Sequence, residues 1–133
     1  MIRTYQGTVY PWNCDHMNQM NVQFYVHKFD QGTWNLFSVL GLTSNYMKEN
    51  NTGLVALEQH IKYLKECNAG DNLSVESEIQ EFKGKIVRFK HLMKNLESDS
   101  IVAECELVGL YIDTKKRKGM EIPKFVSDRW NAI

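Results

Sequence analysis

Asp15 is the residue whose type and position best suit chemistry. It stands in a polar stretch, Asn13-Cys14-Asp15-His16, a few residues before a predicted helix that starts at Asn21. A positioned carboxylate is able to attack a carbonyl carbon or to deprotonate water. Unpaired amide N–H groups and the helix dipole make a helix start electropositive, which stabilises charge developing on a carbonyl oxygen. An aspartate in this position also commonly caps its loop by accepting backbone hydrogen bonds, and the residues alone leave that structural role open.

The cysteines and histidines offer no second centre of comparable strength. Cys14 lies beside Asp15, but the sequence places no histidine to activate it as a nucleophile. The three cysteines contain no C-x-x-C pair, and the four histidines have neither H-x-x-x-H nor H-x-H spacing. We therefore predict no disulfide framework, no zinc knuckle and no metal site, and we expect a reducing compartment.

A long helix over residues 21–41 must position Asp15. Apolar residues recur along it at helical spacing, namely Val22, Tyr25, Val26, Phe29, Leu36, Phe37 and Leu40. Asn21 suits the N-cap and Gly41 suits a left-handed C-cap. Gly32 in the helix interior costs about 1 kcal/mol relative to alanine, which predicts that the helix backbone packs closely on a sheet.

The remainder of the chain is mostly strand-like. Five segments have strand character, at residues 2–10, 53–64, 73–82, 86–94 and 101–112. Short links between the last four imply antiparallel pairing, because parallel strands need crossovers of about a dozen residues or more. A short turn or helix is expected over residues 43–51. The sequence predicts an α+β fold in which a curled, antiparallel five-stranded sheet wraps around one long central helix.

Composition limits the domain count and the partners. The chain has no repeat and no linker-like stretch, so we expect residues 1–133 to form one domain. Sixteen basic residues balance sixteen acidic ones, which gives no overall field for nucleic acid or an anionic membrane. No segment approaches the roughly 20 apolar residues of a membrane span. We expect a soluble cytoplasmic protein without nucleic-acid or membrane partners.

The sequence from Trp12 to Tyr25, which spans the Asp15 stretch and the predicted helix start, resembles a known signature. It is similar to the pattern D-x-D-x-x-G-H-x-N-x-x-x-Y of the 4-hydroxybenzoyl-CoA thioesterase-like branch of the hotdog superfamily. Alignment of the second aspartate with Asp15 assigns the other pattern positions, in order, to Asn13, Asn18, Gln19, Asn21 and Tyr25. The pairs Gly70-Asp71 and Ile122-Pro123 and the hairpin Lys83-Gly84-Lys85 extend the resemblance over most of the chain.

The resemblance implies a hotdog-fold enzyme that hydrolyses an acyl-CoA thioester to the free acid and coenzyme A. Asp15 would act as nucleophile or general base, with the backbone N–H of Val22 as oxyanion donor. Asn18, Gln19 and Asn21 would shape the helix start and position the substrate. Glu58 and His60 would lie on a strand that lines the active site of a partner subunit. A homodimer or homotetramer is implied, with coenzyme A present only as part of the substrate.

The sequence also contains a basic hairpin that could bind phosphate, and two alternative functions fit the same fold. Lys83, Lys85, Arg88 and Lys90 form a candidate site for the phosphates of coenzyme A. A solvated hairpin whose lysines discourage edge pairing explains the same residues equally well. A non-catalytic acyl-CoA or acyl-carrier binding module on the same fold is the main alternative to the enzyme. A hotdog dehydratase, with His16 as its catalytic histidine, is a third.

Overall fold

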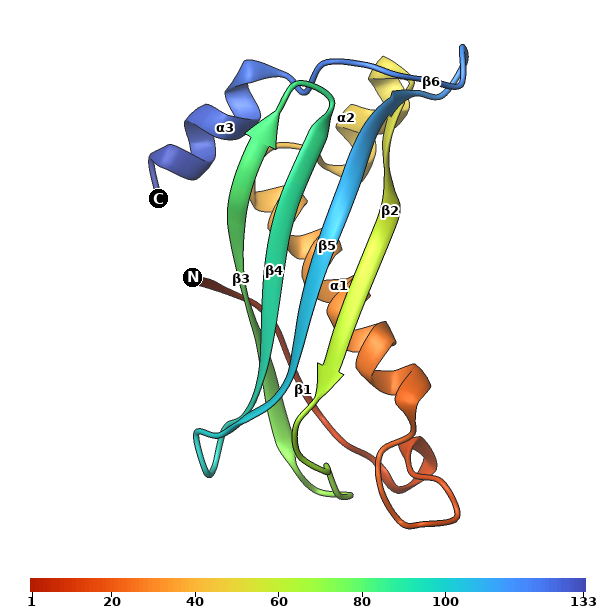
Figure 1. The fold of residues 1–133 in the computed structure, drawn as a ribbon, viewed down its shortest axis with the longest axis vertical. Helices are drawn as coiled ribbons and strands as arrows, with labels where there is room; N and C mark the ends of the chain where they lie inside the picture. The colour runs from red at the N-terminus through yellow and green to blue at the C-terminus, as the bar shows by residue number, and fades with distance from the viewer.

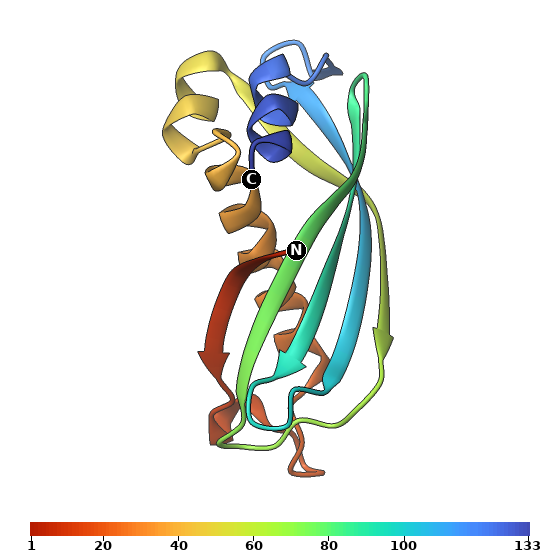
Figure 2. The same cartoon turned by 90° about the vertical axis from the view of Figure 1, so that its left-hand side faces the viewer.

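A long helix lies against the concave face of a curled antiparallel sheet (Figures 1 and 2). The computed structural model describes residues 1–133. Its strands are β1 (Ile2–Thr8), β2 (Thr52–Tyr63), β3 (Asn72–Lys83), β4 (Ile86–Asn95), β5 (Ile101–Asp113) and β6 (Lys118–Gly119). Its helices are α1 (Val22–Val39), α2 (Ser44–Asn50) and α3 (Lys124–Asn131), with a 3₁₀ turn at Pro11–Asn13. The predicted long helix, second short helix and five main strands are thus confirmed.

The strand order is β1-β3-β4-β5-β2, and the two-residue β6 pairs with β5. Every pairing is antiparallel, as predicted. The short link between β2 and β3, however, does not make them neighbours, because β4 and β5 lie between them. The amides of Leu64 and Lys65 donate to the carbonyl of Val102 as this link leaves β2, and the Gly70 amide donates to Val9 where it reaches the far side. The link therefore crosses the end of the sheet.

Both predicted caps of α1 are present. The side chain of Asn21 accepts a hydrogen bond of 3.1 Å from the Gln23 amide, and Gly41 has a φ of +96°. Most of the apolar face packs into the core, as expected from its spacing. Val22 is the exception, because its side chain is 56% exposed in the first turn of the helix. Val22 therefore shares the apolar spacing of α1 without packing into the core.

Gly32 brings α1 into close contact with the sheet. A Cβ atom at this position would lie 3.0 Å from Thr4 Oγ1 and 3.0 Å from Val75 Cγ1. These distances are tighter than ordinary van der Waals contact, so a larger residue would push α1 away from β1 and β3. The predicted close approach of helix backbone and sheet is confirmed.

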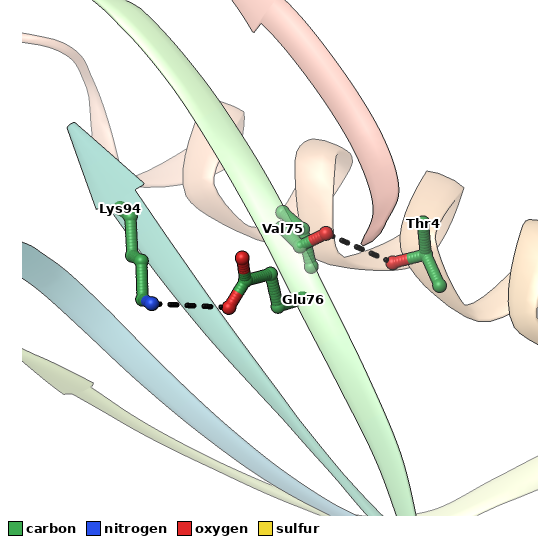
Figure 3. Close-up of polar contacts among 4 residues, drawn as sticks. All are labelled: Thr4, Val75, Glu76 and Lys94. Carbon is green, nitrogen blue, oxygen red and sulfur yellow. Dashed lines mark hydrogen bonds and ion pairs between the residues drawn. The ribbon is translucent and has the colours of Figure 1, made fainter. Parts of the chain in front are cut away.

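The two faces of β3 carry different kinds of polar contact. On the face that carries α1, the buried hydroxyl of Thr4 donates to the carbonyl of Val75 at 3.3 Å, beside a bulge in the β1–β3 ladder (Figure 3). Glu76 next along β3 instead pairs with Lys94 of β4 at 3.1 Å (Figure 3). Alternation along the strand thus separates a buried hydrogen-bonded layer from a partly exposed ionic one.

The helix α3 was not predicted. Only Val126 on it is fully buried, while Phe125 packs edge-to-face against Tyr46 of α2 at a centroid distance of 5.3 Å. Eight mostly polar residues give too few apolar positions for a helical period to be recognised. No helix of the structure has both the length and the apolar character that crossing a membrane requires.

Candidate active site

A tight loop presents Asp15 in front of α1. The loop is closed by an antiparallel bridge between Cys14 and Met20. The Asp15 amide donates to the Gln19 carbonyl at 3.0 Å, and the Asn18 amide donates to the Asp15 carbonyl at 2.9 Å. Asn18 has a φ of +61°, in the left-handed region that asparagine tolerates better than most residues other than glycine. Asn18, which aligns with the glycine of the signature, thus adopts a conformation that glycine also tolerates.

The Asp15 carboxylate is only partly committed to its loop. Its Oδ1 atom accepts a hydrogen bond of 2.9 Å from the Met17 amide, which is the loop-capping role considered from the sequence. Its Oδ2 atom has no hydrogen-bond partner, and neither ion pair of the structure includes Asp15. The side chain is thus fixed through one oxygen while the other remains available.

The first turn of α1 offers a free backbone donor. Asn21 accepts hydrogen bonds from the second and third amides of the helix. Its side chain accepts from the Gln23 amide, and its carbonyl accepts from the Phe24 amide at 3.0 Å. The Val22 amide has no acceptor in the protein. Because the Val22 side chain is exposed, this N–H lies at the surface end of the helix, where the dipole is positive.

One pocket of about 290 Å³ collects the Asp15 carboxylate and the helix start. Its lining residues are Asp15, Gln19, Met20, Val22, Tyr25, Tyr63, Leu64, Lys65 and Glu66. We call it the Asp15 pocket. The structure thus brings together three of the predicted site residues, Asp15, Gln19 and Val22, and adds the end of β2, which sequence reasoning did not associate with them.

Tyr25 forms the inner wall of the Asp15 pocket. Its hydroxyl donates to the Lys65 carbonyl at 3.3 Å, and its ring meets Tyr63 edge-to-face at 5.0 Å. Burial, followed by the hydrogen bond with Cys67, raises the pKa of Tyr25 well above its usual range. Tyr25 therefore stays protonated and serves as a structural donor.

Glu58 and His60 are not brought to the Asp15 pocket. They pair with Val108 and Glu106 on the face of the sheet opposite to α1. Between them, Gln59 pairs with the buried Leu107 and faces α1. A bulge between Ala56 and Glu58 changes the alternation at this point in β2. His16 is exposed in the loop and does not line the Asp15 pocket either.

The predicted basic group lies at the β3–β4 hairpin, at the opposite end of the sheet from the Asp15 loop (Figure 1). Lys83 and Lys85 are exposed beside the hairpin turn. Arg88 pairs with Glu81 at 3.6 Å, and Lys90 lies opposite acidic residues of both neighbouring strands. Neither hairpin lysine takes part in an ion pair, and Glu121 is the acidic residue that lies beside Gly84 of the turn.

A second pocket, of about 240 Å³, lies between α1 and β2 and was missed from the sequence. We call it the α1–β2 pocket. It is lined by Asp30, Thr33, Trp34, Phe37, Leu42, Met47, Leu54, Val55, Ala56, Gln59, Phe89, Leu107 and Gly109. The four-residue spacing of Asp30 and Trp34 predicts that both lie on one face of the helix. The sequence does not predict that β2 lies beside that face.

Neither pocket contains an obvious metal centre. No group of three or more His, Cys, Asp or Glu side chains in the structure is arranged to hold a metal ion. The cysteines are all free, with Cys67 and Cys105 buried. Burial raises the pKa of Cys105 to about 12, so this thiol stays protonated and unreactive at neutral pH.

Comparison with known proteins identified one matching family and two relatives of known name. The family model of the thioesterase-like superfamily matches residues 9–130. The protein of Agrobacterium fabrum named L-carnitine dehydrogenase/betainyl-CoA thioesterase is 28% identical over 109 residues, which are 82% of this chain and 22% of that protein. Its namesake from Ruegeria pomeroyi is 27% identical over 104 residues, or 78% of this chain and 21% of that protein. The chain therefore spans about a fifth of the length of these relatives.

A solved structure supports the fold over nearly the whole chain. A Staphylococcus aureus protein, whose structure was determined in complex with CoA, superposes with a TM-score of 0.90 at 22% identity. The match covers 99% of this chain and 85% of the other. Together with the family match, this similarity confirms the predicted hotdog fold.

Proposed function

This chain belongs to the thioesterase-like superfamily, and we propose that it hydrolyses an acyl-CoA thioester to the free acid and coenzyme A. The observation that carries the proposal is the presence, in one pocket, of an incompletely bonded aspartate and an unpaired helix amide. A thioester oxygen that accepts a hydrogen bond from the Val22 N–H would have its developing charge stabilised. The carboxylate of Asp15 would then act on the polarised carbonyl carbon.

Two routes lead from this arrangement to the same products. In the first, Asp15 attacks the carbonyl carbon and expels the coenzyme A thiolate, and water then hydrolyses the resulting anhydride. In the second, Asp15 takes a proton from water, whose oxygen attacks the carbonyl carbon and expels the thiolate. A thiolate is a good leaving group, so neither route requires an acid to protonate it. Asn18, Gln19 and Asn21 would contribute by holding the loop and the helix start in place.

The names of the relatives suggest a first substrate. Both curated relatives are betainyl-CoA thioesterases in one of their two named activities. Betainyl-CoA is therefore the first thioester to test. We further propose that the reaction takes place in the cytoplasm, where the three free cysteines would remain reduced.

We propose that two copies of the chain pair through β2, alone or within a tetramer. β2 is a twelve-residue edge strand, and its exposed apolar residues include Val55, Leu57 and Tyr63, at 39%, 53% and 47% exposure. Unprotected edges of this kind readily pair with another strand. Antiparallel pairing of two β2 strands would extend the sheet and bury these side chains.

This dimer would also give the basic hairpin a role. A two-fold axis between antiparallel β2 strands inverts one subunit relative to the other. The β3–β4 hairpin of one subunit would then lie toward the end of the dimer that holds Asp15 of the partner subunit. We propose that Lys83 and Lys85 bind phosphates of the coenzyme A held there, with Arg88 and Lys90 contributing less because of their acidic neighbours.

The variant Leu57→Lys should dissociate the dimer. By symmetry each subunit would lose one buried leucine, worth about 1.5–3 kcal/mol, and would gain a charge that must be desolvated on pairing. The dimer dissociation constant should rise roughly 100-fold or more. Sedimentation equilibrium over a range of concentrations measures it. Val39→Lys changes a similarly exposed side chain on α1, at 55%, and should leave the constant unchanged; equal effects of the two variants would argue against pairing through β2.

Thiol release from a panel of acyl-CoAs tests the proposed activity. The panel should include betainyl, acetyl, long-chain and aromatic thioesters. We expect turnover of at least one, with release of one thiol per thioester consumed. Tight binding of acyl-CoA without any turnover would instead indicate the non-catalytic binding module.

A further inference from the structure

The α1–β2 pocket has a charge pattern that points to its occupant. We propose that it receives a quaternary-ammonium acyl group, recognised by Asp30 and Trp34. The inference rests on the proposed hydrolysis of acyl-CoA and specifies the acyl group that this chain selects. It assigns a role to two residues of α1 that belong neither to the Asp15 loop nor to the helix start.

Asp30 is the only ionisable residue in the lining of the pocket. Nine of the thirteen lining residues are hydrophobic, and none is basic. Neither ion pair of the structure includes Asp30, so its carboxylate has no cationic partner within the protein. A carboxylate beside apolar walls attracts cations and repels anionic acyl groups.

Trp34 supplies a second feature that favours a cation. It lies one helical turn beyond Asp30 and remains 56% exposed although it lines the pocket. The face of an indole ring is the strongest cation–π partner among protein side chains. A carboxylate and an exposed indole at one pocket are the combination that recognises quaternary ammonium groups.

The remaining polar groups of the lining offer few hydrogen-bond acceptors to a cation. The hydroxyl of Thr33 lies 3.2 Å from the Phe29 carbonyl and 2.8 Å from His91 Nε2, and both partners belong to the protein. Gln59 and Asp30 are the lining side chains left to accept hydrogen bonds from a ligand. A primary ammonium would need both Asp30 oxygens and the Gln59 oxygen to satisfy its three donors, whereas a quaternary ammonium needs no acceptor. The lining therefore suits a cation that is apolar at its surface.

Size also favours a compact group. Pockets for drug-sized ligands usually enclose about 300–1,000 Å³, and the α1–β2 pocket encloses about 240 Å³. Phe37, Phe89 and Leu107, which are all buried, close its inner side. A short branched acyl group fits these dimensions better than a long chain.

The proposed dimer connects this pocket to the reacting carbonyl. Within one chain, Val22 and Asp30 are eight residues apart on α1, or about 12 Å along the helix axis, which exceeds the length of a short acyl group. In a fully overlapping antiparallel β2 pair, Tyr63 would lie opposite Thr52 of the partner subunit, close to the Leu54 and Val55 that line its α1–β2 pocket. Each Asp15 pocket would thus open toward the α1–β2 pocket of the other subunit.

An isosteric pair of substrates isolates the charge. Betainyl-CoA and 3,3-dimethylbutyryl-CoA have the same branched shape, but a quaternary nitrogen in the first is a neutral carbon in the second. We expect the wild-type dimer to have the higher kcat/KM for betainyl-CoA. Asp30→Asn should lower the ratio of the two kcat/KM values roughly tenfold or more, because it removes the charge and keeps the shape. Asp128→Asn, an exposed change on α3, should leave the ratio unchanged.

Binding provides a readout that does not depend on turnover. Calorimetric titration of both thioesters into Asp15→Asn and into the double variant Asp15→Asn, Asp30→Asn should show tighter binding of betainyl-CoA only where Asp30 is present. If the wild type hydrolyses none of the acyl-CoAs of the panel, the proposed function fails, and this binding comparison still decides the role of the pocket. A ratio unaffected by Asp30→Asn, or a wild-type preference for the neutral thioester, would overturn the inference.

Discussion

Replacing Asp15 by asparagine should lower kcat for acyl-CoA hydrolysis by roughly 10²–10⁴-fold, the usual contribution of a positioned acid–base group. Asparagine keeps the side-chain oxygen that accepts from the Met17 amide at 2.9 Å, so the loop should retain its shape. It loses the negative charge and the basicity of the second oxygen, which has no partner in the protein. The effect should therefore appear in kcat, measured by thiol release, with little change in thermal unfolding.

Asp113 provides a matched control for this prediction. Its Oδ1 atom accepts hydrogen bonds of 2.9 Å from the amides of Lys115 and Lys116, and these bonds lower the pKa of its carboxyl. Like Asp15, it caps a turn, but it lies at the end of β5, outside both pockets. Asp113→Asn should keep wild-type kcat. If Asp15→Asn also keeps it, Asp15 serves only to cap its loop and the proposed mechanism is wrong.

Single turnover in water labelled with oxygen-18 separates the two routes. Hydrolysis of an anhydride at its aspartyl carbon leaves the label in the side chain of Asp15. General-base catalysis sends the label only into the product acid. Mass spectrometry of the peptide that contains Asp15 distinguishes these outcomes.

The sequence predicted those features that depend on residues close together in the chain. The extent of α1 follows from apolar spacing, from the cap at Asn21 and from the left-handed Gly41, all within one segment. The Asp15 loop is equally local, since its turn depends on Asn18 adopting a positive φ. Even the close contact at Gly32 was detectable, because glycine is costly in a helix unless space demands it.

Features that depend on strand register were not predictable in the same way. The bulge near Leu57 decides that Gln59, rather than Glu58 or His60, faces α1. Strand order likewise separates β2 from β3 although a short link joins them. Val22 fits the apolar period of α1 but is exposed, because the first turn of the helix opens onto the Asp15 pocket. Each of these outcomes is set by residues distant in sequence.

His91 carries the second large prediction, which concerns stability. Its imidazole is completely buried between α1 and the sheet. Nδ1 lies 2.6 Å from the Ser77 hydroxyl and Nε2 lies 2.8 Å from the Thr33 hydroxyl, while Ser77 in turn contacts the Thr4 hydroxyl at 2.7 Å. Hydroxyls donate or accept, so this chain satisfies a neutral imidazole in either tautomer. No carboxylate takes part in it to balance an imidazolium.

Acid should therefore destabilise the fold through His91. Burial lowers the pKa of His91 from 6.5 to about 4. Between these values the unfolded chain binds a proton that the folded protein excludes, so stability falls as the pH drops below about 6.5 and the loss levels off below about 4. Since one pKa unit corresponds to about 1.4 kcal/mol, the loss by pH 4.5 should be roughly 2–3 kcal/mol.

Urea unfolding at pH 7 and pH 4.5 measures this loss directly. His91→Gln should be less stable than the wild type at pH 7, because it disturbs a buried network, yet it should lose less stability between the two pH values. His27→Gln alters an exposed histidine of α1 and should keep the wild-type pH dependence. An equally steep loss in His91→Gln and the wild type would mean that other groups set the acid sensitivity. A shallower loss in His91→Gln than in the wild type would identify the neutral, hydrogen-bonded imidazole of His91, beneath the α1–β2 pocket, as the main source of the acid sensitivity.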